Sequence, residues 1–270
     1  MEEKLLQMKS LVERLNQASD SYYNGKGELM TDYEWDALFD QLKRLEEETG
    51  EILPDSPTNR VSEDSIVGKK EEHEFAALSL AKTKQVSDLV KWAEDRPIWI
   101  SWKLDGLTLV VTYDGGKLTK IVTRGNGHIG TNITHLAPAI SGIPATISEK
   151  GHLVVRGEAV ISYTDFEQFI IESEGDYANP RNLASGSLTL KDIDEVKQRH
   201  IQWIPFTLVY TERELTSWGE RMQMLKDLGM NPVERERIDQ PTTENIQLEI
   251  DKFTEKVTSK KNPFPVDGLV

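Results

Sequence analysis

One lysine lies where two strand-like apolar runs meet, a position from which it could act as a nucleophile. Residues 103–106 read Lys-Leu-Asp-Gly, between an aromatic run at 98–102 and an aliphatic run at 107–113. A lysine attacks phosphorus only as a neutral amine, so its ordinary pKa of roughly 10.4 must be lowered by desolvation or a neighbouring cation. Asp105, two residues after Lys103, is expected on the same strand face, where it could orient the amine or a ribose hydroxyl. The same four residue types also occur in ordinary strand-turn sequences, and the motif alone leaves both interpretations open.

Three downstream segments carry residue types that bind phosphate and ribose, and each also has a structural interpretation. Arg124 begins an Arg-Gly-Asn-Gly sequence that could face a phosphate through its guanidinium and free amides; a strand-ending turn is the alternative. Glu158 ends Val-Arg-Gly-Glu at 155–158, where it could accept ribose hydroxyls; a cross-strand ion pair is the alternative. Arg181 lies in Asn-Pro-Arg-Asn at 179–182, a polar turn that could equally cap a helix.

The apolar pattern places these motifs in a mixed body that follows a helical segment. Apolar residues recur at helical spacing over the first ~50 residues, with Thr31 at the expected start of the second helix. Prolines and polar residues at 51–70 indicate a linker, with a boundary near residue 68. Beyond it the pattern predicts strands at 98–102, 107–113, 118–123, 153–161 and 203–210, a hairpin at 114–117, and helices at 84–95, 164–173, 216–228 and 242–258. The expected fold is α+β, an antiparallel sheet carrying helices.

Composition limits the chemistry and the partners. The 270 residues are 37% hydrophobic, enough for a real core, and contain no cysteine, which excludes disulfides, thiolate metal sites and a cysteine nucleophile. The formal charge of -14 opposes tight unaided binding to a nucleic-acid backbone. Because no apolar run approaches the ~20 residues of a membrane span and the charged N-terminus lacks a signal-peptide pattern, we expect a cytoplasmic protein with no membrane partner.

The order of the motifs resembles the N-terminal and adenylation portions of bacterial NAD-dependent DNA ligases. The lysine motif, Arg-Gly, Val-Arg-Gly-Glu, Asn-Pro-Arg-Asn and a final Asp-Gly-Leu-Val occur in one order, and the resemblance covers essentially the whole chain. The family also has counterparts of the segments at 22–23, 32–36, 55–58 and 78–80. The resemblance implies an α+β chain: a small N-terminal helical domain over residues 1–67, then a nucleotidyltransferase (ATP-grasp-like DNA ligase adenylation) domain with antiparallel sheets over residues 68–270, truncated at its C-terminal end.

The resemblance also implies an activity and a set of site residues. Lys103 would attack the adenylyl phosphorus of NAD, expel nicotinamide mononucleotide and form lysyl-AMP, for later transfer to a 5′-phosphate at a DNA nick. Asp105 would be the second catalytic residue. The residues that the resemblance assigns to NAD are Tyr22, Tyr23, Asp32, Trp35, Asp36, Ser79, Leu80, Ser101, Arg124, Glu158 and Arg181. The aromatic and acidic residues of the helical domain would hold the cationic nicotinamide half, and Ser79 and Leu80 would line the adenine. The alternative is that Tyr22 and Trp35 only pack the helical domain.

The same resemblance implies Mg²⁺, which would bind mainly through substrate and water, without a ligand from this chain. It also implies nicked DNA as a partner, bound through domains that are absent from this chain.

Two departures from the family pattern keep other functions open. Ser101 replaces an acidic residue, and Asn126, Thr131 and Asn132 stand where the family has carboxylates. These changes favour a non-catalytic NAD-binding or regulatory paralogue as one alternative. An ATP-dependent polynucleotide ligase module is the other.

Overall fold

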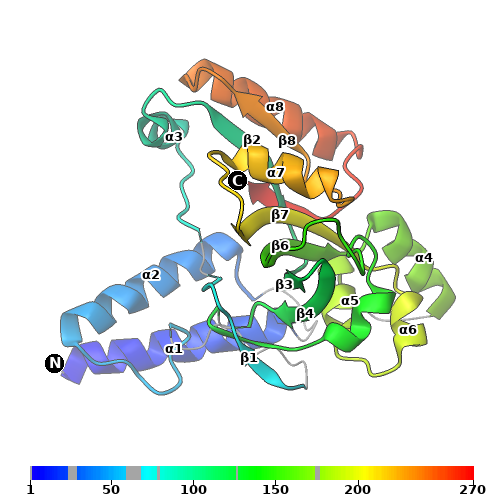
Figure 1. Cartoon of the computed structure of the whole chain (residues 1–270). Helices are drawn as coiled ribbons and strands as arrows, with labels where there is room; N and C mark the ends of the chain where they lie inside the picture. The colour runs from blue at the N-terminus through cyan, green and yellow to red at the C-terminus, as the bar shows by residue number, and fades with distance from the viewer. Residues whose placement is uncertain (1, 24–28, 59–67, 78–79, 126, 174–176) are drawn as a thin grey trace.

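The structure is a computed structural model that describes residues 2–23, 29–58, 68–77, 80–125, 127–173 and 177–270 (Figure 1). Its N-terminal part consists of two helices that pack side by side, α1 (Glu2–Tyr23) and α2 (Asp32–Thr49). Their shared core contains the buried side chains of Met8, Leu11, Val12, Leu15, Leu42 and Leu45. The helical interpretation of the first fifty residues is therefore confirmed.

Local hydrogen bonds explain where α2 begins and how the segment after it packs. Thr31 and Glu34 form a capping box, in which the Glu34 amide donates to the Thr31 hydroxyl and the Glu34 carboxylate accepts from the Thr31 amide. Downstream, the buried Glu46 carboxylate accepts from the hydroxyls of Ser56 at 2.5 Å and Thr58 at 2.6 Å. The segment at 55–58 therefore folds back onto α2.

A four-stranded antiparallel sheet forms the centre of the larger body. Its strand order is β4 (Lys117–Thr123), β3 (Leu107–Asp114), β6 (Leu153–Val160) and β7 (Gln202–Thr211). The predicted hairpin joins β3 to β4, and both of its glycines have positive φ, +59° and +77°. Around this sheet lie five short helices: η1 (Thr134–Ala139), α4 (Tyr163–Ser173), α5 (Pro180–Ser187), α6 (Ile193–Lys197) and α7 (Trp218–Asp227).

A separate three-stranded sheet carries the lysine motif. Its order is β8 (Arg235–Ile238), β2 (Ile98–Leu104) and β9 (Val266–Leu269), and α3 (Val86–Ala93) and α8 (Thr243–Thr258) pack beside it (Figure 1). Trp102 points toward α8, where its ring meets that of Phe253 edge-on at 4.5 Å. Because side chains alternate along a strand, Lys103 projects from the opposite face. A third, two-stranded sheet pairs β1 (Lys70–Glu72) with β5 (Ile129–Thr131).

The predicted strands and long helices are present, with boundaries within about three residues. The expected fold class, α+β with antiparallel sheets, is confirmed, and the strands divide into three sheets. The sequence pattern did not predict the strands β1, β5, β8 and β9, because they have three or four residues each, too few to show an alternating pattern.

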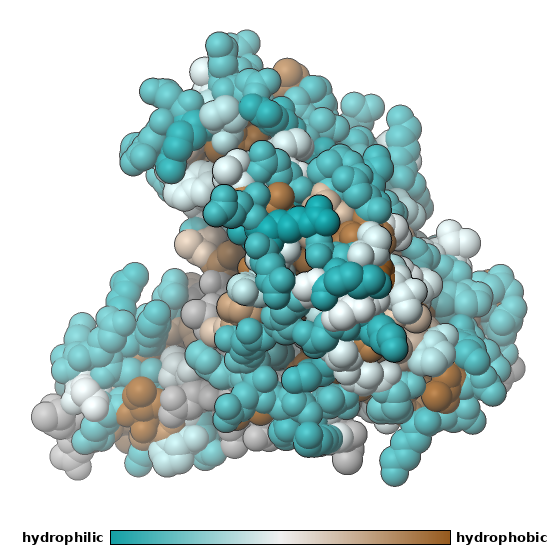
Figure 2. Space-filling model, viewed as in Figure 1, coloured by the Kyte–Doolittle hydropathy of each residue, from teal (hydrophilic) through white to brown (hydrophobic). Residues whose placement is uncertain are grey.

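Figure 2 shows a mainly hydrophilic surface on the viewed face. In the described part of the chain, no helix has the length and apolar character that a membrane span requires.

Candidate active site

Lys103 lies on β2 at the point where β9 pairs with it. Its amine donates to both carboxylate oxygens of Asp267, at 2.7 and 2.5 Å. Asp267 comes from β9, where Gly268 is the register partner of Lys103. The lysine side chain is 45% exposed and can therefore be reached by a ligand. Asp267 was not identified as a partner of Lys103 from the sequence, although its Asp-Gly-Leu-Val motif was noticed.

Asp105 contacts an arginine and not the lysine. Its carboxylate pairs with the Arg181 guanidinium at 2.5 Å. β2 ends at Leu104, so Asp105 lies just beyond the strand, and the β2–β9 register shifts between Lys103 and Leu104. The carboxylate beside the lysine in this structure is therefore Asp267.

Arg181 reaches Asp105 from the first turn of α5. The cap of this helix is Asn179, whose side-chain oxygen accepts from the Asn182 amide at 2.8 Å, and Pro180 occupies the first helical position. The capping interpretation of the Asn-Pro-Arg-Asn segment is therefore confirmed, and Arg181 pairs with Asp105; a contact of Arg181 with phosphate stays a prediction.

Glu158 is buried between β3 and β6. Directly opposite on β3, the Thr108 hydroxyl donates to Glu158 Oε2 at 2.8 Å, and the Gly106 amide donates to Oε1 at 3.2 Å. Burial raises the Glu158 pKa to about 7, against the opposing effects of the Thr108 hydrogen bond and the positive charges of Arg181 and Lys103. Gly106 is needed for this contact, because a Cβ there would lie 2.1 Å from the Ala159 carbonyl oxygen.

The two arginine-glycine motifs both make contacts within the fold, and a phosphate contact of Arg124 stays a prediction. The turn interpretation of the first motif is confirmed, because Gly125 has φ +53° and a Cβ there would lie 2.0 Å from the Ile129 carbonyl oxygen. The guanidinium Nε of Arg124 donates to the Ala77 carbonyl at 2.9 Å. Gly157 makes room for the Trp203 indole and not for a ligand, since a Cβ would lie 2.5 Å from its nitrogen. Arg156 donates to the carbonyls of Phe75 and Ala76, and Glu158 accepts from Thr108 and Gly106, so the cross-strand ion pair is not formed among the described residues.

The structure describes only some of the other residues that the family resemblance assigns to NAD. Trp35 stacks on Phe39 at 4.9 Å and donates its indole N–H to the Leu15 carbonyl, so it packs the helical unit; a contact with NAD stays a prediction. Leu80 is exposed, and Ser101 is buried and pairs through its backbone with Val270. Outside the described part of the structure lie Ser79, Asn126 and the side chains of Tyr22, Tyr23, Asp32 and Asp36.

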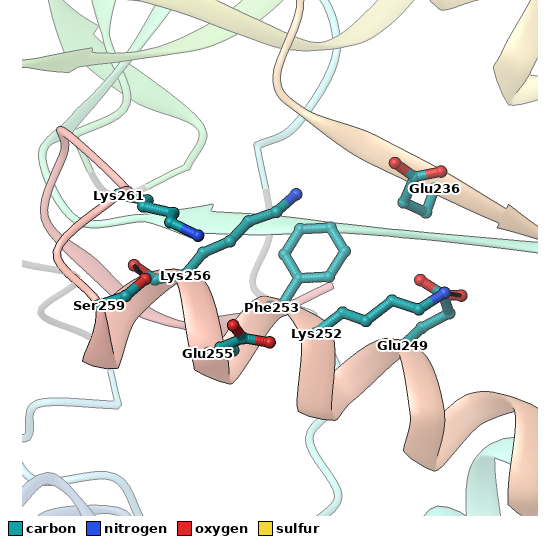
Figure 3. A pocket seen from close by; sticks show the side chains of 8 residues that line it. All are labelled: Glu236, Glu249, Lys252, Phe253, Glu255, Lys256, Ser259 and Lys261. Carbon is teal, nitrogen blue, oxygen red and sulfur yellow. Dashed lines mark hydrogen bonds and ion pairs between the residues drawn. The ribbon is translucent and has the colours of Figure 1, made fainter.

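A groove of about 340 Å³ between β8 and α8 lies on the other face of β2, beside Phe253 (Figure 3). Three lysines and three glutamates line it: Lys252, Lys256, Lys261, Glu236, Glu249 and Glu255. Its charges therefore balance, and it provides no net attraction for an anionic ligand. Because Trp102 and Lys103 point to opposite faces of β2, this groove is separate from the lysine.

Comparisons with known proteins find matches over both parts of the chain. The family described as NAD-dependent DNA ligase adenylation domain matches residues 69–270, and the DNA ligase-like, N-terminal NAD+-binding domain matches residues 1–62. DNA ligases of Lachnoclostridium phytofermentans and Ruminiclostridium cellulolyticum are each 39% identical over the whole chain, which covers 42% and 41% of them. The DNA ligase of Leptospira biflexa is 35% identical over 97% of the chain and 40% of its own length.

The fold and these matches define an adenylation domain preceded by an NAD+-binding domain. The chain belongs to the NAD-dependent DNA ligase family. It spans about two fifths of the length of the curated relatives it matches.

Burial of Glu158 predicts a pH-dependent stability. A carboxyl group whose pKa rises from 4.5 in the unfolded chain to about 7 in the folded one destabilises the fold increasingly between those pH values. Above pH 7 the ionised Glu158 lowers the free energy of unfolding by roughly 3 kcal/mol in full. We expect Glu158→Gln to remove most of the stability loss between pH 5 and pH 8, measured by urea unfolding of both proteins at both values. An equal loss in the wild type and the variant would show that Glu158 does not titrate in this range.

Proposed function

We propose that the chain transfers adenylate from NAD to its own Lys103 and releases nicotinamide mononucleotide. The observation that carries this proposal is the surroundings of the lysine: an exposed amine paired with Asp267, near the Asp105–Arg181 pair and the buried Glu158. A nucleophile, a carboxylate in contact with it and a cation near the reacting group are what attack on a phosphate requires. Family membership favours NAD as the adenylate donor.

The Lys103 amine donates to the Asp267 carboxylate, and a lysine attacks phosphorus only as a neutral amine. Attack requires that the amine lose a proton, and Asp267 is placed to accept it at 2.5 Å. The lysine nitrogen then bonds to the adenylyl phosphorus while the bond from phosphorus to the nicotinamide mononucleotide oxygen breaks, and that oxygen leaves with the electron pair. Arg181 and Glu158 would position the phosphate and the ribose, respectively.

We further propose that the two units divide the dinucleotide, with residues 1–67 holding nicotinamide mononucleotide and residues 68–270 performing the chemistry. Their hydrophobic cores are separate, since the core of the first contains side chains from the first 53 residues and those of the second contain side chains from residue 86 onward. In the described residues, no group of three His, Cys, Asp or Glu side chains could hold a metal ion. We infer that Mg²⁺ binds mainly through substrate phosphates and water. Later transfer of AMP to nicked DNA would use contacts beyond this chain. We propose that this reaction takes place in the cytoplasm.

The test is covalent labelling. The wild-type chain is incubated with NAD or ATP labelled in the adenylate moiety, with Mg²⁺, and separated by denaturing electrophoresis. We expect label on the protein from NAD and not from ATP. Reversible binding of NAD without a covalent product would support the non-catalytic paralogue, and labelling from ATP would support the ATP-dependent alternative.

A further inference from the structure

A short turn between α8 and β9 leads into the strand that carries Asp267. It is the Asn262 turn, residues 262–265, with the sequence Asn-Pro-Phe-Pro. β9 begins at Val266, the residue that follows the turn, and Asp267 comes next. The carboxylate that accepts from Lys103 therefore lies two residues after the turn, and the shape of the turn helps to determine where this carboxylate lies.

The backbone of the Asn262 turn also bonds to two other elements of the body. The Pro265 carbonyl accepts from the Asp105 amide at 2.8 Å, just beyond the end of β2. The Pro263 carbonyl accepts from the amide of Tyr163, the first residue of α4, at 2.9 Å. The turn therefore links the segment that carries Asp105 to the strand that carries Asp267.

The side chain of Asn262 holds the turn in its shape. Its amide nitrogen donates to the Phe264 carbonyl at 2.7 Å, and its side-chain oxygen accepts from the Phe264 amide at 3.4 Å. Pro263 and Pro265 have no amide hydrogen, so the turn has few backbone donors with which to close, and the asparagine side chain takes their place. Because Asn262 is only 9% exposed, an apolar side chain here would leave the Phe264 groups without these bonds.

The other end of the turn is fixed to α8. The amides of Lys261 and Asn262 both donate to the Lys256 carbonyl, at 2.9 and 3.3 Å. The Phe264 side chain packs against the hydrophobic cluster of the three-stranded sheet. The Asn262 side chain thus connects a fixed helix end to the backbone that leads into β9.

We propose that Asn262 is a positioning residue for the attack of Lys103: by closing the turn, it sets the place of Asp267 relative to the lysine amine. This inference rests on the proposed function, in which Asp267 accepts the proton of Lys103. Within the described part of the chain, the hydrogen bonds of Asn262 go to Phe264 and Lys256, so its effect reaches the amine through the backbone. A displacement of about 1 Å at the reacting groups can slow a reaction about a hundredfold.

The experiment measures a single turnover of self-adenylation by the full chain over a range of NAD concentrations. The rate constant for lysyl-AMP formation reports how the reacting groups are placed, and the final amount of lysyl-AMP reports the fraction of folded, competent protein. We expect Asn262→Leu to lower the rate constant at saturating NAD at least about tenfold, with little change in the final amount. A role limited to stability would lower the final amount and leave the rate constant unchanged.

The half-saturating NAD concentration should change less than about threefold in Asn262→Leu. The residues proposed to bind the phosphate and the ribose, Arg181 and Glu158, are held by contacts outside the turn: the Asn179 cap of α5 and the Thr108 hydroxyl. The expected effect of the variant is therefore on the chemical step and not on the binding of NAD.

Asn262→Ser is the conservative variant, because a serine hydroxyl also bonds to the backbone of a turn, though more weakly. We expect its rate constant to lie between the other two, about threefold below the wild type. If Asn262→Leu does not fold, Asn262→Ser alone is decisive, and a wild-type rate constant in this variant would overturn the inference.

Asn245→Leu is the matched control. The Asn245 side-chain amide also donates to a backbone carbonyl, that of Gln240 at 2.8 Å, but near the first turn of α8, at the opposite end of the helix from the Asn262 turn. We expect this variant to keep the wild-type rate constant. The inference is overturned if Asn262→Leu stays within twofold of the wild type, or if Asn245→Leu slows the reaction equally. A wild-type chain that forms no lysyl-AMP would instead contradict the proposed function.

Discussion

Lys103→Arg is expected to abolish covalent transfer of AMP from NAD, with a loss of at least about a thousandfold in rate, because a guanidinium stays protonated and cannot attack phosphorus. The measurement is covalent labelling from NAD labelled in the adenylate moiety. Arginine can keep the ion pair with Asp267, so the β2–β9 pairing should survive. Loss of labelling with an unchanged unfolding temperature would therefore be a chemical effect.

Lys103→Ala complements this test, because it removes the nucleophile and leaves Asp267 without its partner. We expect the same loss of labelling, with some loss of stability. Retained adenylation in either variant would remove Lys103 from its proposed role, whatever the behaviour of the other residues.

Deleting residues 1–66 should remove the use of NAD while the remaining body stays folded. Only NAD offers a nicotinamide mononucleotide half, and binding of that remote half can contribute to orientation at the phosphorus. We expect self-adenylation from NAD to fall by at least about a hundredfold. The body should keep a cooperative thermal unfolding transition, because its two hydrophobic clusters contain only its own residues.

Equilibrium binding of AMP to the truncated protein is the control for this deletion. The body should still bind AMP, since the proposed adenosine contacts lie after residue 68. Unaltered NAD use by a folded truncated protein would show that the helical unit does not hold the nicotinamide half.

The sequence predicted the long elements because their patterns repeat. β3, β6 and β7 each have eight or more residues, and α8 has sixteen, enough for an alternating or helical period to be visible. The four-residue strands β8 and β9 carry no such signal. The number of sheets was therefore not predicted, because two of the three sheets depend on strands of three or four residues.

The candidate site was also predictable from the sequence only in part. Lys103, Asp105, Glu158 and Arg181 were identified from motifs, and the structure gives each of them a charged or hydrogen-bonding neighbour. Their pairing was not predictable, because Lys103 pairs with a residue 164 positions later and Arg181 comes from a helix that begins after the Asn179 cap. The burial of Glu158 results from the close approach of two strands at Gly106, which no local pattern reveals.

The pairing of Lys103 with Asp267 has a consequence for synthesis on the ribosome. The two residues are 164 positions apart, and at about 5–20 residues per second the aspartate is added about 8–33 seconds after the lysine. During that interval β2 lacks its β9 neighbour, and the lysine has no carboxylate opposite it. A contact of such long range forms only after a large loop has closed, so it is expected among the later steps of folding. The nucleophile and its proton acceptor thus come together only near the end of translation of this segment, after the sheet that surrounds Glu158 has been synthesised in full.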